Sequence, residues 1–238
     1  MHISWHQLFH LGEPMLTLPA GSAIAAWLLA ARAWRPALGW IVGFGLALGL
    51  VAASKIAFMG WATGLPALAF KAISGHATGF AAVFPTLCYL AMPARARAPA
   101  AGAALALAAV VAAALVHAGE HTLAESAAGW LIGAGTFLGT ARLAGSTSAA
   151  AARGAAPGAT PSAASTATSA ASAAEPVPAT SAAGAPAFAP TPATLACAAL
   201  AFLASAWLLR STPLNWWMIK VALVLSGNTA AVPWDHCG

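Results

Sequence analysis

Apolar residues run in long blocks along this chain, separated by short polar or basic stretches. Six blocks contain almost no charged residues, and they occupy positions 15–31, 36–53, 74–92, 99–118, 126–141 and 194–209. Each block is close to the roughly 17 to 25 residues that a helix needs to cross the apolar core of a bilayer. The pattern predicts an all-α, polytopic transmembrane helical bundle of about six spans, with a core of five helices.

The composition supports this prediction. The chain is 61% hydrophobic and only 6% charged, with a mean hydropathy of +0.80, whereas soluble domains carry about 25% charged residues. We therefore expect an integral, multi-pass membrane protein that has membrane lipids as its partners. The segment before Met15 lacks the lysines and arginines of a secretory signal peptide, so we expect the first span to remain as an anchor.

Arginines occur in every second connection between the apolar blocks, at Arg32, Arg35, Arg95, Arg97, Arg142 and Arg153. The positive-inside rule assigns these connections to the cytoplasm, which predicts that the N-terminus and the connections 54–73 and 119–125 face the outer, periplasmic or extracytoplasmic side. The net charge of +5 is not gathered into a basic stripe with interleaved aromatic residues, so no nucleic-acid partner is expected. The three cysteines are scattered and indicate neither a disulfide framework nor a zinc knuckle.

Residues 144–193 are almost wholly Ala, Ser, Thr, Pro and Gly. Such a sequence has too little apolar surface to fold, so it predicts a disordered linker. The linker separates a membrane-embedded core, residues 1–143, from residues 194–238, which hold an additional transmembrane helix. The segment 212–225 follows that helix and carries Trp216, Trp217 and Lys220 among aliphatic residues, a mixture typical of a helix that lies along the lipid headgroups.

Glycines four residues apart recur in the second and fifth blocks, as Gly39 with Gly43, Gly45 with Gly49, Gly129 with Gly133 and Gly135 with Gly139. This spacing allows membrane helices to approach closely. We expect the two blocks to be core helices, so that the connection after the second block lies beside the connection before the fifth.

The first of these two connections ends in Ser74-Gly75-His76, at the start of the third block. The exposed amides and the positive end of a helix form an anion site there, where Ser74 can cap the helix and Gly75 admits a phosphate oxygen. Lys55 and Lys71 supply two positive charges on the same side of the membrane.

The second connection contains His121-x-x-x-Glu125. Histidine can serve as a nucleophile or an acid near neutral pH, and a carboxylate four residues along a helix can hold its ring. The two connections together predict phosphate chemistry at a membrane surface.

Three stretches carry a resemblance to a known family: Lys55, Ser74-Gly75-His76-Ala77, and His121-x-x-x-Glu125-x-x-x-Gly129-Trp130-Leu131-x-Gly133. In order and spacing they resemble the three phosphatase motifs of the type 2 phosphatidic acid phosphatase, or lipid phosphate phosphatase, superfamily. The resemblance covers residues 51–139, and its specificity lies in the combination of motifs.

The resemblance implies a phosphatase that acts on a lipid-linked phosphate monoester or diphosphate, without a metal or other cofactor. It makes His121 the nucleophile that becomes a phosphohistidine, His76 the general acid and Glu125 the carboxylate that orients the nucleophile. Lys55 and the amides of Ser74 and Gly75 would bind the phosphate, and Lys71 adds a second cation.

The chain departs from the family pattern at four positions. Ala62 and Leu115 stand where the first and third motifs have arginines, Ile73 replaces a proline, and Glu125 replaces an aspartate. Each hydrogen bond to a charged group contributes about 1.5 to 3 kcal/mol, so the lost arginines predict weaker phosphate binding unless Lys71 compensates. A noncatalytic membrane relative of the family is therefore an alternative.

A second alternative is a zinc-dependent membrane peptidase. His117, Glu120 and His121 fit the His-x-x-Glu-His pattern, in which two histidines on one helical turn bind zinc and the glutamate activates water. The pattern needs a further ligand, and the candidates are Glu125, Glu175, Asp235 and His236. His2, His6 and His10 also share a helical face, for which a short interfacial helix is the preferred interpretation.

Overall fold

The structure, a computed structural model, describes residues 12–154, 188 and 190–233. Its helices are α2 (Pro14–Ala30), α3 (Trp34–Trp61), α4 (Gly75–Ala91), α5 (Ala94–His117), α6 (Leu123–Gly154), α7 (Pro192–Ser211) and α8 (Leu214–Ser226), with a short 3₁₀ turn, η2 (Pro66–Leu68). Within the described residues the only β pairing is an isolated bridge between Leu65 and Phe70. The prediction of an all-α helical bundle is confirmed.

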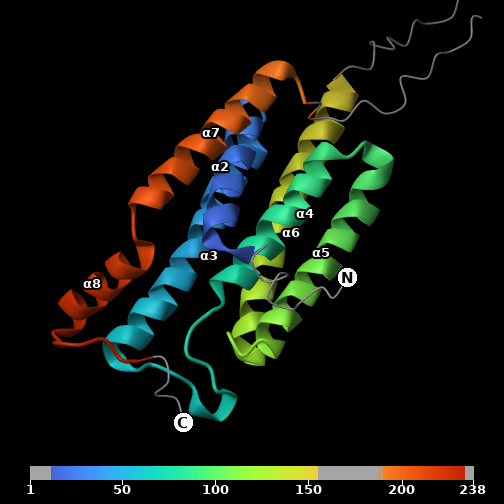
Figure 1. Ribbon diagram of the computed structural model, residues 1–238. Helices are drawn as coiled ribbons and strands as arrows, with labels where there is room; N and C mark the ends of the chain where they lie inside the picture. Colours follow the sequence, from blue (N-terminus) through green and yellow to red (C-terminus); the bar gives the residue numbers. More distant parts are fainter. Residues whose placement is uncertain (1–11, 155–187, 189, 234–238) are drawn as a thin grey trace, which may run out of the picture.

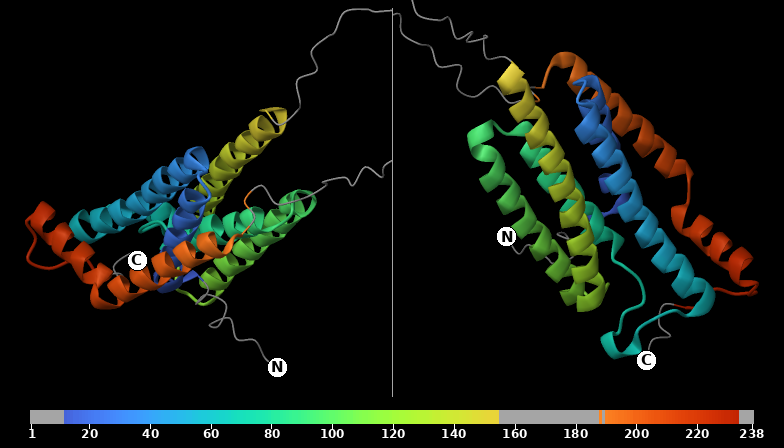
Figure 2. Two further views of the ribbon diagram at one scale, coloured as in Figure 1. Left: turned by 90° about the horizontal axis from the view of Figure 1, so that it is seen from above. Right: turned by 180° about the vertical axis from the view of Figure 1, so that it is seen from behind.

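The helices form a bundle of rods, in which α4 packs most extensively against α6 and α5 (Figure 1). α6 also packs against α3, and α7 runs alongside α2. The view from above shows α8 beside α3 at the outer edge of the bundle (Figure 2). The C-terminal segment is thereby attached to the same helix that carries Lys55.

Three helices among the described residues, α3, α5 and α7, are long and apolar enough to cross a membrane. This indicates membrane association. α2 and α4 cover the first and third predicted spans with 17 residues each, at the short end of what a crossing needs. Each of the six apolar blocks and the segment 212–225 coincides with a helix, whereas six crossings are not established.

Two helices extend beyond the apolar blocks that predicted them. α3 continues to Trp61, so Lys55 lies on a helix rather than in a connection. α6 continues to Gly154, into the segment expected to be a disordered linker. That extension contains a run of alanines, the residue with the highest helix propensity, which favours continuation of the helix. The rest of the linker, apart from its last few residues and Phe188, lies outside the described residues.

Glycines bring α6 close to α4. A Cβ atom added to Gly129 would lie 2.5 Å from the carbonyl oxygen of Ser74, and one added to Gly133 would meet the carbonyl of Thr78. Gly39 and Gly43 lie against α6 side chains, Gly43 in ordinary van der Waals contact with Thr136, whereas the pairs at 45 and 49 and at 135 and 139 have nothing within 4 Å. The pair at 129 and 133 therefore mediates the closest backbone approach, and it places the connection before α4 against the start of α6.

Candidate functional site

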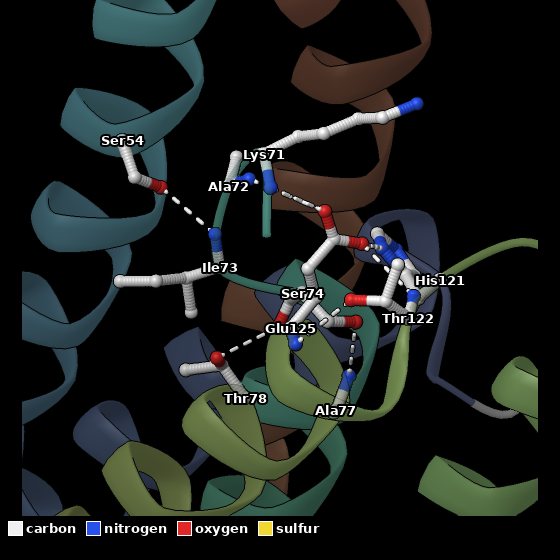
Figure 3. A network of polar contacts seen from close by, with 10 residues as sticks. All are labelled: Ser54, Lys71, Ala72, Ile73, Ser74, Ala77, Thr78, His121, Thr122 and Glu125. Carbon is white, nitrogen blue, oxygen red and sulfur yellow. Dashed lines mark hydrogen bonds and ion pairs between the residues drawn. The ribbon is translucent and has the colours of Figure 1, made fainter. Parts of the chain in front are cut away.

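The carboxylate of Glu125 joins the two predicted motifs (Figure 3). Its side chain is 4% exposed. Oε1 accepts hydrogen bonds from Lys71 N at 2.8 Å and Ala72 N at 3.4 Å. Oε2 accepts from Thr122 N at 3.1 Å and lies 3.0 Å from His121 Nδ1. A single side chain thus holds the loop before α4 and the histidine before α6 in one place.

Thr122 explains why α6 begins where it does. Its Oγ1 accepts a hydrogen bond from Glu125 N at 3.3 Å, while the Glu125 carboxylate accepts one from Thr122 N. This reciprocal pair is a capping box, Thr-x-x-Glu, which satisfies two amides that the first helical turn leaves without partners. The sequence analysis missed Thr122, although its spacing to Glu125 is visible in the sequence.

Burial raises the pKa of Glu125, but hydrogen bonds from Lys71 N, the His121 ring, Thr122 N and Ala72 N outweigh it and hold the pKa below its ordinary value. The carboxylate is therefore ionised at neutral pH. An ionised carboxylate only accepts hydrogen bonds, so Nδ1 of His121 donates to it, and in the neutral ring the lone pair is then on Nε2. Nε2 is the atom available as a nucleophile.

His121 lies in a short turn that backbone hydrogen bonds hold in place. α5 ends at His117, and Gly119 follows with a φ of +75°. The amides of Glu120 and His121 then donate to Leu115 O, at 3.1 and 3.4 Å. Leu115 itself is fully buried.

Ser74 is fully buried and anchors α4. Its Oγ accepts from Ala77 N at 3.4 Å, and its amide donates to Glu125 O at 3.2 Å. The carbonyl of Ser74 accepts from Thr78 Oγ1 at 2.8 Å. The amide and the hydroxyl of Ser74 thus have partners within the protein, and a contact of Ser74 or Gly75 with phosphate stays a prediction.

Ser54 of α3 fixes the same loop from the other side. Its Oγ accepts a hydrogen bond from Ile73 N at 3.1 Å (Figure 3). The same hydroxyl donates to Val51 O at 2.8 Å within α3. A proline at position 73, as in the family pattern, has no amide hydrogen and would form no such bond. No signal in the sequence singles out Ser54, because its partner lies across a loop of variable shape.

His76 lies in the first turn of α4, outside the three helices that qualify as spans, and its ring centroid is 6.1 Å from that of His121. Burial lowers the pKa of His76 to about 4, assisted by the charges of His121 and Lys55 and opposed by those of Glu13 and Glu120. In the protein alone, His76 is therefore neutral at pH 7.

A cavity of 690 Å³ opens beside this network. It is lined by Lys55, Lys71, Gly119, Glu120, His121, Thr122, Glu125 and Asn215. Four of the predicted site residues thus share one cavity, whereas Ser74, Gly75 and His76 are not among the residues that line it. Asn215 was missed, because it belongs to α8 and follows a long linker in the sequence.

The two positions that lack arginines offer no replacement charge. Ala62 is exposed and ends α3 with a φ of +52°, and Leu115 packs in the core with Ala77, Ala112 and Trp130. Within the described residues, the cations that line the cavity are Lys55 and Lys71.

The geometry disagrees with a zinc peptidase. α5 ends at His117, which is exposed, and the left-handed Gly119 separates it from His121, so the two histidines do not share a helical turn. The described part of the chain holds no group of three or more His, Cys, Asp or Glu residues suited to a metal ion. Glu175, Asp235, His236 and the N-terminal histidines His2, His6 and His10 lie outside the described residues.

Comparisons with protein-family models, curated proteins and solved structures find no match for this chain.

Proposed function

We propose that this protein is an integral membrane phosphatase that hydrolyses a lipid-linked phosphate monoester or diphosphate through a phosphohistidine intermediate. The observation that carries the proposal is the 3.0 Å contact of His121 Nδ1 with Glu125, beside His76 and in a cavity that also contains two lysines. A histidine nucleophile, a carboxylate that orients it and a second histidine are the groups that such a reaction needs.

In the first step, His121 Nε2 attacks phosphorus and forms a P–N bond. The bond between phosphorus and the leaving oxygen breaks, and His76 donates a proton to that oxygen. Glu125 stabilises the positive charge that develops on the His121 ring, because its ionised carboxylate faces Nδ1.

In the second step, water attacks the phosphohistidine and the P–N bond breaks, releasing inorganic phosphate. His76, now neutral, takes a proton from the attacking water and returns to its starting state. His76 must be protonated for the first step. Burial is the main cause that lowers the pKa of His76, and the nearby positive charge adds to it; the negative charge of a bound phosphate acts in the opposite direction and favours the protonated ring.

Lys55 and Lys71 bind the phosphate in this scheme. Both line the cavity that contains the His121 ring, and they replace in part the charge of the two absent arginines. The Gly75 amide, at the start of α4, is a further donor for the phosphate.

An apolar hollow supports a substrate with a hydrocarbon chain. This hollow, of 380 Å³, lies between α5 and α6 and is lined by Ala109, Ala112, Ala113, Leu123, Ser126, Ala127, Trp130 and Leu131. Leu123 and Ser126 flank Glu125 on the first turn of α6, so the polar cavity and the apolar hollow adjoin the same turn. A lipid that enters laterally between helices can place its phosphate in the cavity and its chain in the hollow.

The distribution of arginines supports a site on the outer side of the membrane. Arg32 and Arg95 lie in the connections from α2 to α3 and from α4 to α5. These connections are at the end of the bundle opposite to the start of α6 (Figure 1). By the positive-inside rule that end faces the cytoplasm, and His121 then faces the periplasmic or extracytoplasmic side.

Phosphate release from a panel of lipid phosphates by the purified protein, with and without EDTA, tests the proposal. We expect release that is insensitive to EDTA, because the proposed chemistry uses only side chains and amides. No release from any lipid would favour a noncatalytic relative. Loss of activity in EDTA with rescue by zinc would overturn the metal-free mechanism.

A further inference from the structure

Helix α8 is fixed beside the cavity by its contacts with the end of α3. Asn228 Nδ2 donates to Gly60 O at 2.6 Å, just after α8 ends. A Cβ atom added to Gly60 would lie 3.2 Å from Ala222 O, so the two helices approach closely. Asn215, in the first turn of α8, is thereby held among the residues that line the cavity.

The lining of the cavity balances positive and negative groups. It contains two lysines, Lys55 and Lys71, and two glutamates, Glu120 and Glu125. Glu125 is committed to four donors, but Glu120 is exposed at the rim. One phosphate matches the two lysines, whereas a second phosphate would add negative charge next to Glu120.

The cavity is larger than a single phosphate requires. Its 690 Å³ falls within the range of about 300 to 1,000 Å³ that is typical of sites for whole small molecules. The group next to the phosphate therefore also occupies the cavity. The side-chain amide of Asn215 can both donate and accept hydrogen bonds, and a hydroxyl on that group can do the same. The oxygens of a second phosphate mainly accept hydrogen bonds, so they would use only the donor of this amide.

We propose that Asn215 determines substrate specificity by binding a hydroxyl on the alcohol that carries the phosphate. This inference rests on the proposed phosphatase function and narrows its substrate to a phosphate monoester of a hydroxylated lipid, in preference to a diphosphate. α8 then serves as a wall of the site, contributed by the chain after the linker.

A matched pair of substrates tests this role. The first is 1-oleoyl-glycerol 3-phosphate, and the second is its 2-deoxy analogue, which lacks only the hydroxyl; farnesyl diphosphate is the third substrate. For the unmodified protein we expect kcat/KM to be about 3- to 10-fold higher for the first than for the second, as one neutral hydrogen bond predicts. Asn215→Ala should bring this ratio close to one. Leu214→Ala, an exposed neighbour outside the cavity lining, should leave it unchanged.

The outcomes separate the inference from the proposed function. Hydrolysis of both monoesters with a ratio that Asn215→Ala does not change, or a preference for farnesyl diphosphate, would overturn the inference and leave the phosphatase intact. Hydrolysis of no substrate would overturn both.

The position of α8 has a test that does not depend on activity. In a cysteine-free background, Asn215→Cys and Glu120→Cys should be joined by a short bismaleimide, because both residues line the same cavity. Absence of this cross-link, or a Leu214→Cys and Glu120→Cys pair that is joined equally well or better, would overturn the placement of Asn215 at the cavity.

Discussion

Replacement of Glu125 by glutamine tests the part of the site that the structure defines best. The substitution keeps the size of the side chain and removes its charge. One amide oxygen can still accept from Lys71 N and Ala72 N, as Oε1 does now. The amide nitrogen then faces His121 Nδ1 and Thr122 N, and both of these are donors in the present arrangement. The variant therefore loses the contact that orients His121 while the loop before α4 keeps its anchor.

The expected magnitude follows from the bond that is lost. A hydrogen bond to a charged group contributes about 1.5 to 3 kcal/mol, and each 1.36 kcal/mol in the barrier is tenfold in rate. If the His121–Glu125 contact acts in the transition state, kcat should fall by about 10- to 150-fold. KM should change little, because Lys55 and Lys71 still bind the phosphate. Loss of the capping box should also lower the free energy of unfolding by about 0.5 to 2 kcal/mol.

Glu120→Gln is the matched control. It removes the same charge from the lining of the same cavity, at an exposed side chain that takes no part in the hydrogen bonds of the Glu125 carboxylate. Steady-state phosphate release should be reduced in Glu125→Gln and nearly normal in Glu120→Gln. An equal reduction of kcat in both variants would refute the orienting role, because the cavity charge alone would then account for the effect.

Three further predictions concern the support of the site. Ser54→Ala leaves the amide of Ile73 without its acceptor and should lower the free energy of unfolding by about 1 to 3 kcal/mol. In the same thermal unfolding assay Ser22→Ala should have little effect, because the Ser22 hydroxyl donates to Leu18 O within its own helix. Gly129→Ala should destabilise the protein, because its Cβ would lie 2.5 Å from an α4 carbonyl oxygen; Gly135→Ala, with open space around it, should be neutral or stabilising by up to about 1 kcal/mol in the same assay. The His76 ring should titrate near pH 4 by NMR, and its pKa should rise on addition of inorganic phosphate. The pKa of His76 is lower in the folded protein than in the unfolded chain, so the unfolded chain binds the proton at a higher pH. The contribution of His76 to stability is therefore present above pH 6.5 and is lost as the pH falls towards 4. A His76 pKa of 6.5 or above in the protein alone would contradict this expectation.

The helices could be predicted from the sequence because their signals are local. Six blocks of apolar residues and the segment 212–225 located the seven α-helices among the described residues, and the glycine spacing at 129 and 133 indicated the close approach of α6 to α4. The ends were less predictable. Hydropathy ended the second block at 53, but α3 continues to Trp61, because a helix needs only backbone hydrogen bonds and tolerates Lys55 near its end.

The candidate site could be predicted in part, for the same reason. His121 and Glu125 are four residues apart, and although His121 precedes the first turn of α6, the contact that this spacing predicts is present. The contacts of Ser54 with Ile73 and of Asn215 with the cavity join segments that are distant in the sequence. No periodicity or spacing reports such contacts, because they depend on how α3, α8 and the connecting loop pack together.

The most direct test of the central claim is to trap the phosphohistidine. His76→Ala removes the proposed acid, so an activated aryl [³²P]phosphate, whose leaving group needs no proton, should still transfer phosphate to His121 while hydrolysis of the intermediate slows. After rapid quenching, we predict an acid-labile, alkali-stable label on the peptide that contains His121. The label should also be present in the double variant His76→Ala with His117→Ala, and it should be absent from the double variant His76→Ala with His121→Ala. Hydrolysis of the aryl phosphate without such a label, or a label that persists when His121 is replaced, would contradict the account.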